Sequence, residues 1–195
     1  MRYKEFNSKK VLEDSMTLFW NNGFGSCAIN DIVKLTNVNC FSLYNEFENK
    51  EGILLHTLAL YKERYSNHSL APLNKGSTIR TVLKTFFNSY LINNGIRPPG
   101  CYTIHIATEL ADSDDRIKQF LENYINQLET GFQSLLVRNE VTNESSQQIA
   151  KHLVGLFCNS MCFCVIQTPK EQHDYIDNCL DLILNKTLKH VTYTS

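Results

Sequence analysis

The sequence predicts an all-α fold, and three observations support that prediction. Only 8 Gly and 4 Pro interrupt the 195 residues, so the elements should be long, as helices are. Apolar residues between 117 and 136 recur at steps of three and four over about five turns. No stretch of convincing length alternates apolar and polar residues as a half-buried strand does. We therefore expect helices packed on helices, in one compact domain or two small ones that share a core.

The composition excludes several classes of protein. With 43% hydrophobic and 20% charged residues, the chain is neither disordered nor collagen-like. The longest unbroken apolar run is residues 161–166, so neither a signal peptide nor a membrane span is expected. Seven cysteines at irregular spacings lie mostly inside apolar helical segments, which favours reduced thiols in the cytoplasm over a disulfide framework.

Capping residues mark the ends of the expected helices. Asp112 or Ser113 would accept hydrogen bonds from the first turn of the helix over 117–136. Residues 168–171, Thr-Pro-Lys-Glu, form a capping box with proline at the first helical position, which predicts a last helix over 169–190. Further helices are expected over 50–68, over 77–93, from about 101 and over 145–167.

The first fifty residues predict three short helices. The first should end at Gly23, because glycine can take the left-handed conformation that closes a helix. The second runs from residue 27 or 28 to 35 and the third over 40–47, and Asn37 between them can adopt a positive φ. Two short helices joined by a tight turn form a helix-turn-helix.

Several residues in this segment form a recognisable pattern. The pattern consists of Leu18–Phe19 four residues before Gly23–Phe24, Asp31–Val33, Val38, Ser42, and the run Leu-Tyr-Asn-Glu-Phe-Glu-Asn-Lys-Glu over 43–51. In these residues the stretch over 11–53 resembles the DNA-binding domain of the TetR family of transcriptional regulators. The detailed match covers roughly a quarter of the chain, and the order of helices behind it fits a nine-helix regulator.

The resemblance implies a bacterial homodimer with two functional parts. Residues 1–48 would be the helix-turn-helix DNA-binding domain, whose third helix enters the major groove of a pseudo-palindromic operator in double-stranded DNA. Residues 49–195 would form the ligand-binding and dimerisation domain. Hydroxyls and a lysine would contact phosphates or base edges, and asparagines would read adenine edges. The expected DNA-binding residues are Asn30, Lys34, Asn39, Ser42, Tyr44, Asn45 and Lys50.

The charge of this segment departs from the family pattern. The family often has a basic residue at the positions of Asn30 and Cys40, and glycine at the position of Phe41. Residues 1–52 carry six basic and seven acidic side chains, a net charge of −1. Because phosphate contacts supply the salt-dependent part of DNA affinity, we expect a modest salt dependence and weak non-specific binding.

Cys101 is a candidate redox sensor. It follows Gly100 at the expected start of a helix, and this segment is similar to a Gly-Cys element of one TetR branch, some members of which sense electrophiles or oxidants. A helix N-terminus favours the thiolate, and His105 lies one turn further on. The alternative is a small buried packing residue. A thiol enzyme using these two residues lacks an orienting group and oxyanion donors, so no enzyme activity is expected.

Metal ions and cofactors are not expected. Cys101, His105 and Glu109 share a helical stripe, but that stripe is about 12 Å long, so one ion could touch two of them at most. The cysteines at 158, 162 and 164 point to different sides of one helix and cannot converge on one ion.

Aromatic residues with a few polar groups suggest a pocket for a small apolar or aromatic effector. Packing in the core explains the same side chains without a ligand. The expected lining is Tyr61, Tyr65, Phe86, Tyr90, Cys101, His105, Tyr124 and Phe157.

The last two helices are apolar over more than one face, so each needs a second partner. We expect that partner to be the same pair of helices from another subunit, in a four-helix bundle around a two-fold axis. The expected interface residues are Ile149, Leu153, Phe157, Cys164, Ile176, Leu180, Ile183 and Leu184.

Taken together, the sequence predicts a ligand- or redox-responsive DNA-binding transcriptional regulator, expected to act as a repressor. One alternative is an interaction protein on the same scaffold whose DNA-reading surface is weakened or lost. The acidic Glu46 and Glu48, and the missing basic residues at positions 30 and 40, motivate this alternative.

Overall fold

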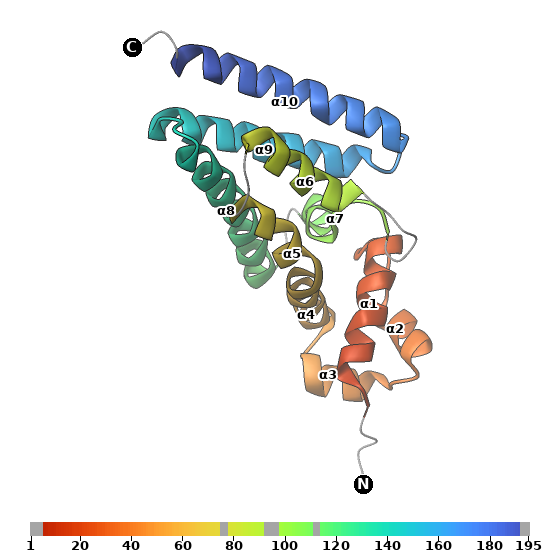
Figure 1. Ribbon diagram of the computed structural model, residues 1–195. Helices are drawn as coiled ribbons and strands as arrows, with labels where there is room; N and C mark the ends of the chain where they lie inside the picture. Colours follow the sequence, from red (N-terminus) through yellow and green to blue (C-terminus); the bar gives the residue numbers. More distant parts are fainter. Residues whose placement is uncertain (1–5, 75–77, 92–97, 111–113, 192–195) are drawn as a thin grey trace.

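A computed structural model describes residues 6–74, 78–91, 98–110 and 114–191 (Figure 1). These residues form helices and connecting turns, and the described part of the chain contains no strand. The elements are α1 (Ser8–Asn22), α2 (Ile29–Thr36), α3 (Cys40–Phe47), α4 (Lys50–Tyr61), the π-helical turn η1 (Lys62–Ser66), α5 (Asn67–Leu70), the 3₁₀ turn η2 (Ala71–Asn74), α6 (Ile79–Leu91), α7 (Tyr102–Glu109), α8 (Asp115–Arg138), α9 (Asn143–Phe163) and α10 (Pro169–Val191).

The rod from α4 to η2 is continuous, because the residues at its internal junctions all have right-handed helical dihedral angles. Counted with that rod as one helix, the described residues form nine helices, which confirms the predicted all-α architecture. The one-turn π-helix inside the rod is absent from the sequence prediction, which treats residues 50–68 as one regular helix. The sequence pattern does not reveal it, since a single extra residue in one turn leaves the apolar spacing almost unchanged.

Figure 1 shows how the helices are arranged. Helices α1 to α3 form a head at one end of the molecule, and α9 and α10 lie antiparallel to each other at the opposite end. The rod that begins with α4 leads from the head into the body, and α8 runs along the body beside it. Effects of the body on the head can therefore pass through α4 or through the contacts that α7 and α8 make with the head.

Capping residues fix several helix ends as the sequence predicts. Gly23 closes α1 with a φ of 82°. Asn37 closes α2 in the left-handed conformation with a φ of 58°. The backbone N–H of Thr168 donates to the Glu171 carboxylate at 2.8 Å, and the Thr168 hydroxyl accepts from the N–H of Glu171 at 3.3 Å, so the capping box before α10 is formed.

The ends of α8 and α9 differ from the prediction in three places. Asp114 caps α8, with its carboxylate accepting from the N–H of Arg116 at 2.8 Å, while the expected caps Asp112 and Ser113 lie outside the described residues. Helix α9 starts at Asn143, two residues before the predicted start, because the Thr142 side chain caps it. It also ends four residues before the predicted end at 167.

The buried apolar side chains of the head and the body belong to one continuous core. Phe19, Ile32 and Leu43 fill the head, and Leu58 on α4 continues the same core into the body. The elbow between α3 and α4 depends on Gly52, because a Cβ there would lie 1.8 Å from the carbonyl oxygen of Phe47. This close approach sets the angle at which the head joins the rod.

Candidate nucleic-acid interface and effector core

Helices α2 and α3 form a helix-turn-helix in which α3 presents a face away from the core. Leu43 and Phe47 are buried and hold α3 against the head. Asn39 caps α3, with its Oδ1 accepting from the N–H of Ser42 at 2.8 Å. This bond occupies the side-chain carbonyl of Asn39 and leaves its amide group as a donor.

The outward face of α3 is largely uncharged. Phe41 is 63% exposed, Tyr44 is 39% exposed and Asn45 is exposed, while Ser42 is half-buried at the edge of this face. Desolvation, with Cys40 one turn before, raises the pKa of Tyr44, so its phenol stays a neutral hydroxyl at neutral pH. This face can therefore offer hydroxyl, amide and aromatic groups to a partner.

Lys50 does not lie on that outward face. Its ammonium donates to the carbonyl oxygens of Phe24 at 3.0 Å and Cys27 at 2.8 Å, and it sits 4.0 Å from the centre of the Phe24 ring. The expectation that Lys50 points outward with Ser42 and Tyr44 is therefore corrected. The carbonyls of the turn between α1 and α2 lie within reach of the first turn of α4, and they satisfy the ammonium.

Three other charged residues of interest in the head, Lys34, Glu46 and Glu48, are exposed. Lys34 lies 4.0 Å from the Asp31 carboxylate with its side chain 80% exposed, and Asn30 is exposed on the same helix. The two acidic residues that motivate the alternative function have polar partners. The Ser8 hydroxyl donates to Glu46, and Arg116 of α8 pairs with Glu48 at 3.0 Å. The charge of Glu48 is therefore partly offset, and its contact with Arg116 ties the head to the body.

The expected effector residues gather around a packed aromatic core. The ring of Phe157 lies 4.8 Å from that of Tyr90 and 5.3 Å from that of Phe86, measured between centroids. The Tyr124 hydroxyl lies 3.2 Å from the Tyr90 hydroxyl and 3.3 Å from the sulfur of Cys101. Tyr61 is also buried, with Tyr65 5.3 Å away. In this structure these side chains fill the space with one another.

Cys101 is buried next to Tyr124 rather than exposed at a helix end. Burial raises the pKa of its thiol, which outweighs the favourable effect of hydrogen bonds from neighbours such as Tyr124. The thiolate that an oxidant-sensing cysteine needs is therefore disfavoured in this conformation. All seven cysteines of the chain are free thiols in this structure.

His105 belongs to a contact between the body and the head. Its Nε2 lies 3.2 Å from Oε1 of Glu109, one turn further along α7. Oε2 of Glu109 in turn accepts a hydrogen bond from the N–H of Gly25 at 3.1 Å. Glu109 was not expected in this role, because the contact joins residues 84 positions apart and no local pattern announces it.

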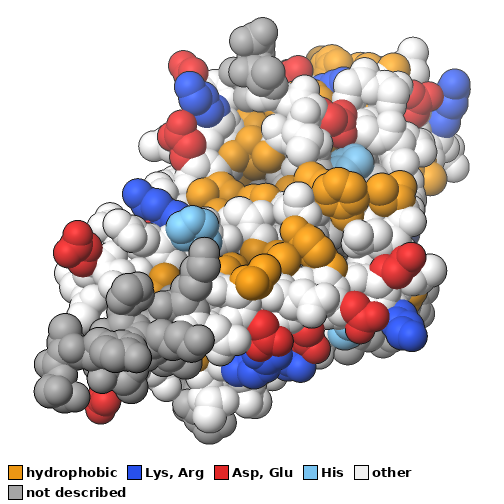
Figure 2. Space-filling model, turned by 90° about the horizontal axis from the view of Figure 1, so that it is seen from above, with side chains coloured by type: hydrophobic (Ala, Val, Ile, Leu, Met, Phe, Trp, Pro, Cys, Tyr) orange, Lys and Arg blue, Asp and Glu red, His pale blue; other side chains and the backbone are white. Residues whose placement is uncertain are grey.

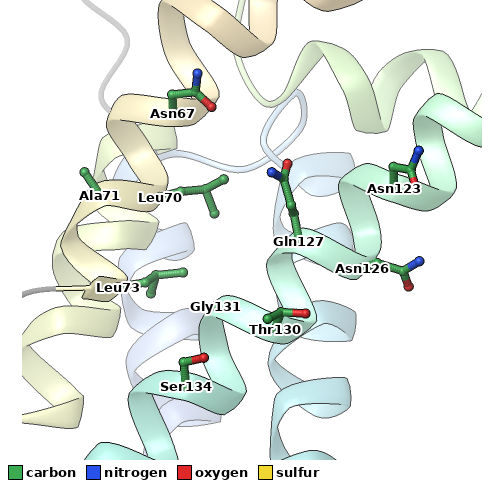
Figure 3. A pocket seen from close by; sticks show the side chains of 10 residues that line it. All are labelled: Asn67, Leu70, Ala71, Leu73, Asn123, Asn126, Gln127, Thr130, Gly131 and Ser134. Carbon is green, nitrogen blue, oxygen red and sulfur yellow. The ribbon is translucent and has the colours of Figure 1, made fainter.

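An open groove lies between the α5–η2 end of the rod and α8 (Figure 3). Its volume is about 570 Å³, and six of the ten residues that line it are polar. The lining residues are Asn67, Leu70, Ala71, Leu73, Asn123, Asn126, Gln127, Thr130, Gly131 and Ser134. The sequence analysis missed these residues, because amides on the polar side of an amphipathic helix look like an ordinary solvated face.

The expected interface residues mostly lie inside the subunit. Ile149, Leu153, Phe157, Ile176, Leu180 and Leu184 are buried in its own core, and Cys164 and Ile183 are half-buried. This corrects the choice of residues, because apolar spacing alone does not tell which side of a helix faces its own subunit. The outer sides of α9 and α10 carry a second apolar set: Val154, Cys158, Cys162, Tyr175, Cys179 and Leu182.

Figure 2 shows this end of the molecule from above, with hydrophobic side chains forming a band across it. Leu182 is 66% exposed, and Val165 and Ile166 are exposed in the turn after α9. The opposite flank of α10 is held by α6, where Lys84 pairs with Asp177 at 2.9 Å and Arg80 pairs with Asp181. The apolar flank is thus the side of α10 that remains available to a partner.

Two further observations limit the kinds of site present in the described residues. No three His, Cys, Asp or Glu side chains there lie close enough together to hold a metal ion. None of the helices described is both long enough and apolar enough to cross a membrane.

Comparisons with known proteins identify relatives of this arrangement. No family model matches the chain. It is 25% identical over 169 residues to the HTH-type transcriptional repressor ComR of Escherichia coli K12, covering 85% of this chain and 79% of ComR.

Solved structures give a closer likeness in fold. A cysteine variant of the TetR family transcriptional regulator CifR, complexed with 26-base-pair operator DNA, superimposes with a TM-score of 0.81 at 15% identity, covering 92% of this chain and 98% of that one. The reduced form of Escherichia coli NemR gives a TM-score of 0.73 at 18% identity, covering 91% and 95%.

Proposed function

We propose that this chain, whose fold is that of the TetR-family transcriptional regulators, is a DNA-binding transcriptional repressor that acts as a homodimer on a pseudo-palindromic operator. The observation that carries the proposal is the helix-turn-helix whose second helix, α3, presents Phe41, Tyr44 and Asn45 outward. The N-terminal residues of such a helix contact base edges in the major groove. The operator complex of CifR, a protein of the same fold, supports the same mode of binding.

The proposed dimer uses the outer sides of α9 and α10. Exposed apolar groups there, such as Leu182 at 66% exposure, are costly in water, and pairing across a two-fold axis would bury them. A dimer of this kind holds two α3 helices at a fixed separation, which DNA can match with half-sites about one helical turn apart.

The proposed effector is a small molecule with an apolar or aromatic body. The buried rings of Phe86, Tyr90 and Phe157, with the hydroxyl of Tyr124 beside them, offer the mixture of apolar surface and few polar groups that such ligands need. Since these rings fill the space in this structure, an effector would have to select a conformation in which they separate. Oxidation at Cys101 remains a second proposal and requires the same opening, because the thiol is buried.

Selection of bound duplexes from a random pool tests the function directly. The proposal predicts that the selected duplexes share a palindromic sequence and that the purified protein binds them as a dimer. Recovery of no duplex at low salt would contradict it. We also expect a modest salt dependence, since Lys50 is directed inward and α3 contains no basic residue, so a logarithmic slope near −8 or steeper would contradict the proposed interface.

A second candidate function is an interaction protein on the same scaffold. The inward position of Lys50 and the exposed apolar residues Leu35 and Phe41 favour it, because an exposed apolar surface suits a protein partner. Failure to retain any duplex, together with an intact dimer, would favour this candidate over the repressor.

A further inference from the structure

Phe41 occupies an unusual position in the head. It is 63% exposed at the second residue of α3, and the spacing from Leu43 places it about 160° around the helix axis from the buried side. Exposure of the apolar surface of a phenyl ring to water is unfavourable, and burial of this surface against a partner would lower the free energy. Tyr44 and Asn45 lie on the same outward side, one turn or less further along.

The composition of α3 excludes recognition of a base by a basic side chain of this helix. Arginine or lysine bound to guanine is a common specific contact in the major groove, yet α3 contains no basic residue. Of the two described lysines nearest in sequence, Lys50 binds backbone carbonyls, and Lys34 lies on α2 with an exposed side chain 4.0 Å from Asp31. Base recognition by α3 itself would therefore use apolar contact and neutral hydroxyl and amide groups, such as the amide of Asn45.

We propose that Phe41 recognises a thymine in each half-site through the 5-methyl group of the base. This inference rests on the proposed function, because it assumes that α3 enters the major groove. The methyl group of thymine is the characteristic apolar feature that a base pair shows there, and phenylalanine is among the side chains that contact it. The position of Phe41 in the first turn of α3 is where a recognition helix meets base edges.

The neighbours of Phe41 fit an A·T-rich half-site. Asn45 lies four residues after Phe41 and hence on the same side of α3, one turn away. Its exposed amide can pair with the N6 and N7 atoms of adenine. The exposed Tyr44 hydroxyl can donate to a phosphate beside the same base pairs.

Replacement of thymine by uracil tests the proposal, because it removes only the methyl group. In the selected operator, each thymine is changed to uracil one position at a time, and affinity is measured at one fixed salt concentration. We expect one position per half-site at which the change to uracil weakens binding about fourfold. Changing this position in both half-sites should weaken binding about fifteenfold. Each factor is the effect of removing one buried methyl-sized group.

The variant Phe41→Ala should bind more weakly and lose this discrimination, with equal affinity for the thymine and uracil duplexes. Leu35→Ala is the matched control, since it removes another exposed apolar side chain of the helix-turn-helix and should retain the wild-type sensitivity to uracil. Both variants change exposed residues, and unchanged thermal midpoints would show that they fold.

Three results would overturn the proposal while leaving the proposed function intact. They are a selected operator without a required thymine, a wild-type protein insensitive to uracil at every position, and a Phe41→Ala variant as sensitive as the wild type. Recovery of no duplex at all would instead contradict the proposed function. If the wild-type protein bound no DNA but associated with a protein partner, and Phe41→Ala abolished that association, the same surface would belong to the second candidate function.

Discussion

Lys50 is a residue whose chemistry is set by its contacts rather than by its type. A lysine at the first position of a helix that follows α3 suits a phosphate contact, yet its ammonium binds the carbonyls of Phe24 and Cys27 and lies over the Phe24 ring. These groups belong to the turn between α1 and α2. Lys50 therefore ties that turn to α4 and helps to hold the head together.

Lys50→Met should destabilise the protein by about 1–3 kcal/mol, because it leaves two backbone carbonyls without their charged donor. Urea unfolding measures this change. Lys34→Met is the control and should change the free energy of unfolding by less than about 0.5 kcal/mol, since its side chain is exposed. A Lys50→Met variant with unchanged stability but much weaker operator binding would show that the side chain serves phosphate contact instead.

The buried tyrosine hydroxyls and cysteine thiols of the body lower the free energy of unfolding at alkaline pH. Burial raises the pKa values of Tyr90, Tyr124 and Cys101, and raises that of Cys158 to about 11. In the unfolded chain these groups lose their protons near their usual values, 9.0 for cysteine and 10.0 for tyrosine. The unfolded state therefore binds fewer protons than the native state above about pH 9, and stability falls as the pH rises.

The variant Tyr124→Phe should lessen this fall. Removing one such group should make the slope of the unfolding free energy above pH 10 shallower by up to about 1.4 kcal/mol per pH unit. Chemical denaturation between pH 8 and pH 11 measures the slope. Tyr44→Phe is the control and should keep most of the wild-type slope, because its hydroxyl is more exposed. Equal slopes for all three proteins would contradict the assignment.

At the scale of elements, α7 connects the aromatic core to the head. Its first residues adjoin Cys101 and the core, and its last residue, Glu109, accepts from the N–H of Gly25 in the turn between α1 and α2. A movement of the core that displaces α7 would therefore shift the turn between α1 and α2 through the hydrogen bond between Glu109 and Gly25. The pair formed by Arg116 and Glu48 provides a second contact, between α8 and the end of α3.

Glu109→Ala should expose the N–H of Gly25 to solvent. We expect hydrogen exchange at Gly25 to become about tenfold faster, since the loss of one charge-assisted hydrogen bond is worth about 1.4 kcal/mol or more. The N–H of Asn37 is an internal control, because it donates to the carbonyl of Val33 at the end of α2 and should be unaffected. NMR exchange rates of both amides provide the measurement, and an unchanged rate at Gly25 would refute the contact.

At the scale of the whole molecule, the helix-turn-helix head lies at one end and the apolar surface of α9 and α10 at the other (Figures 1 and 2). One continuous core joins the two ends. In the proposed dimer, a conformational change in the body would therefore alter the angle or the separation of the two heads.

Leu182→Lys should separate the proposed dimer, because a charge would then be buried at the centre of an apolar contact. We expect the mass in solution to fall from twice 22.5 kDa to 22.5 kDa at concentrations where the wild type is dimeric. Leu35→Lys places the same charge on another exposed leucine, in the head, and should leave the dimer intact. Light scattering after gel filtration distinguishes the two. A Leu182→Lys variant that stays dimeric would place the interface elsewhere.

The sequence by itself determines the helices, most of their ends and the helix-turn-helix. These features depend on residues a few positions apart: the apolar spacing in α8, Asn37 in its left-handed turn, and the capping box at Thr168. The resemblance to TetR-family regulators rests on the same local segment, and the fold confirms it.

Only the tertiary structure decides which way individual side chains face. Lys50 meets carbonyls more than twenty residues away, Glu109 meets Gly25, and Leu153 and Leu180 turn toward their own subunit instead of outward. Cys101 is buried because distant helices cover the start of α7. Apolar spacing and helix capping act along a few residues of chain, whereas burial and long-range hydrogen bonds depend on which distant segments the fold brings together.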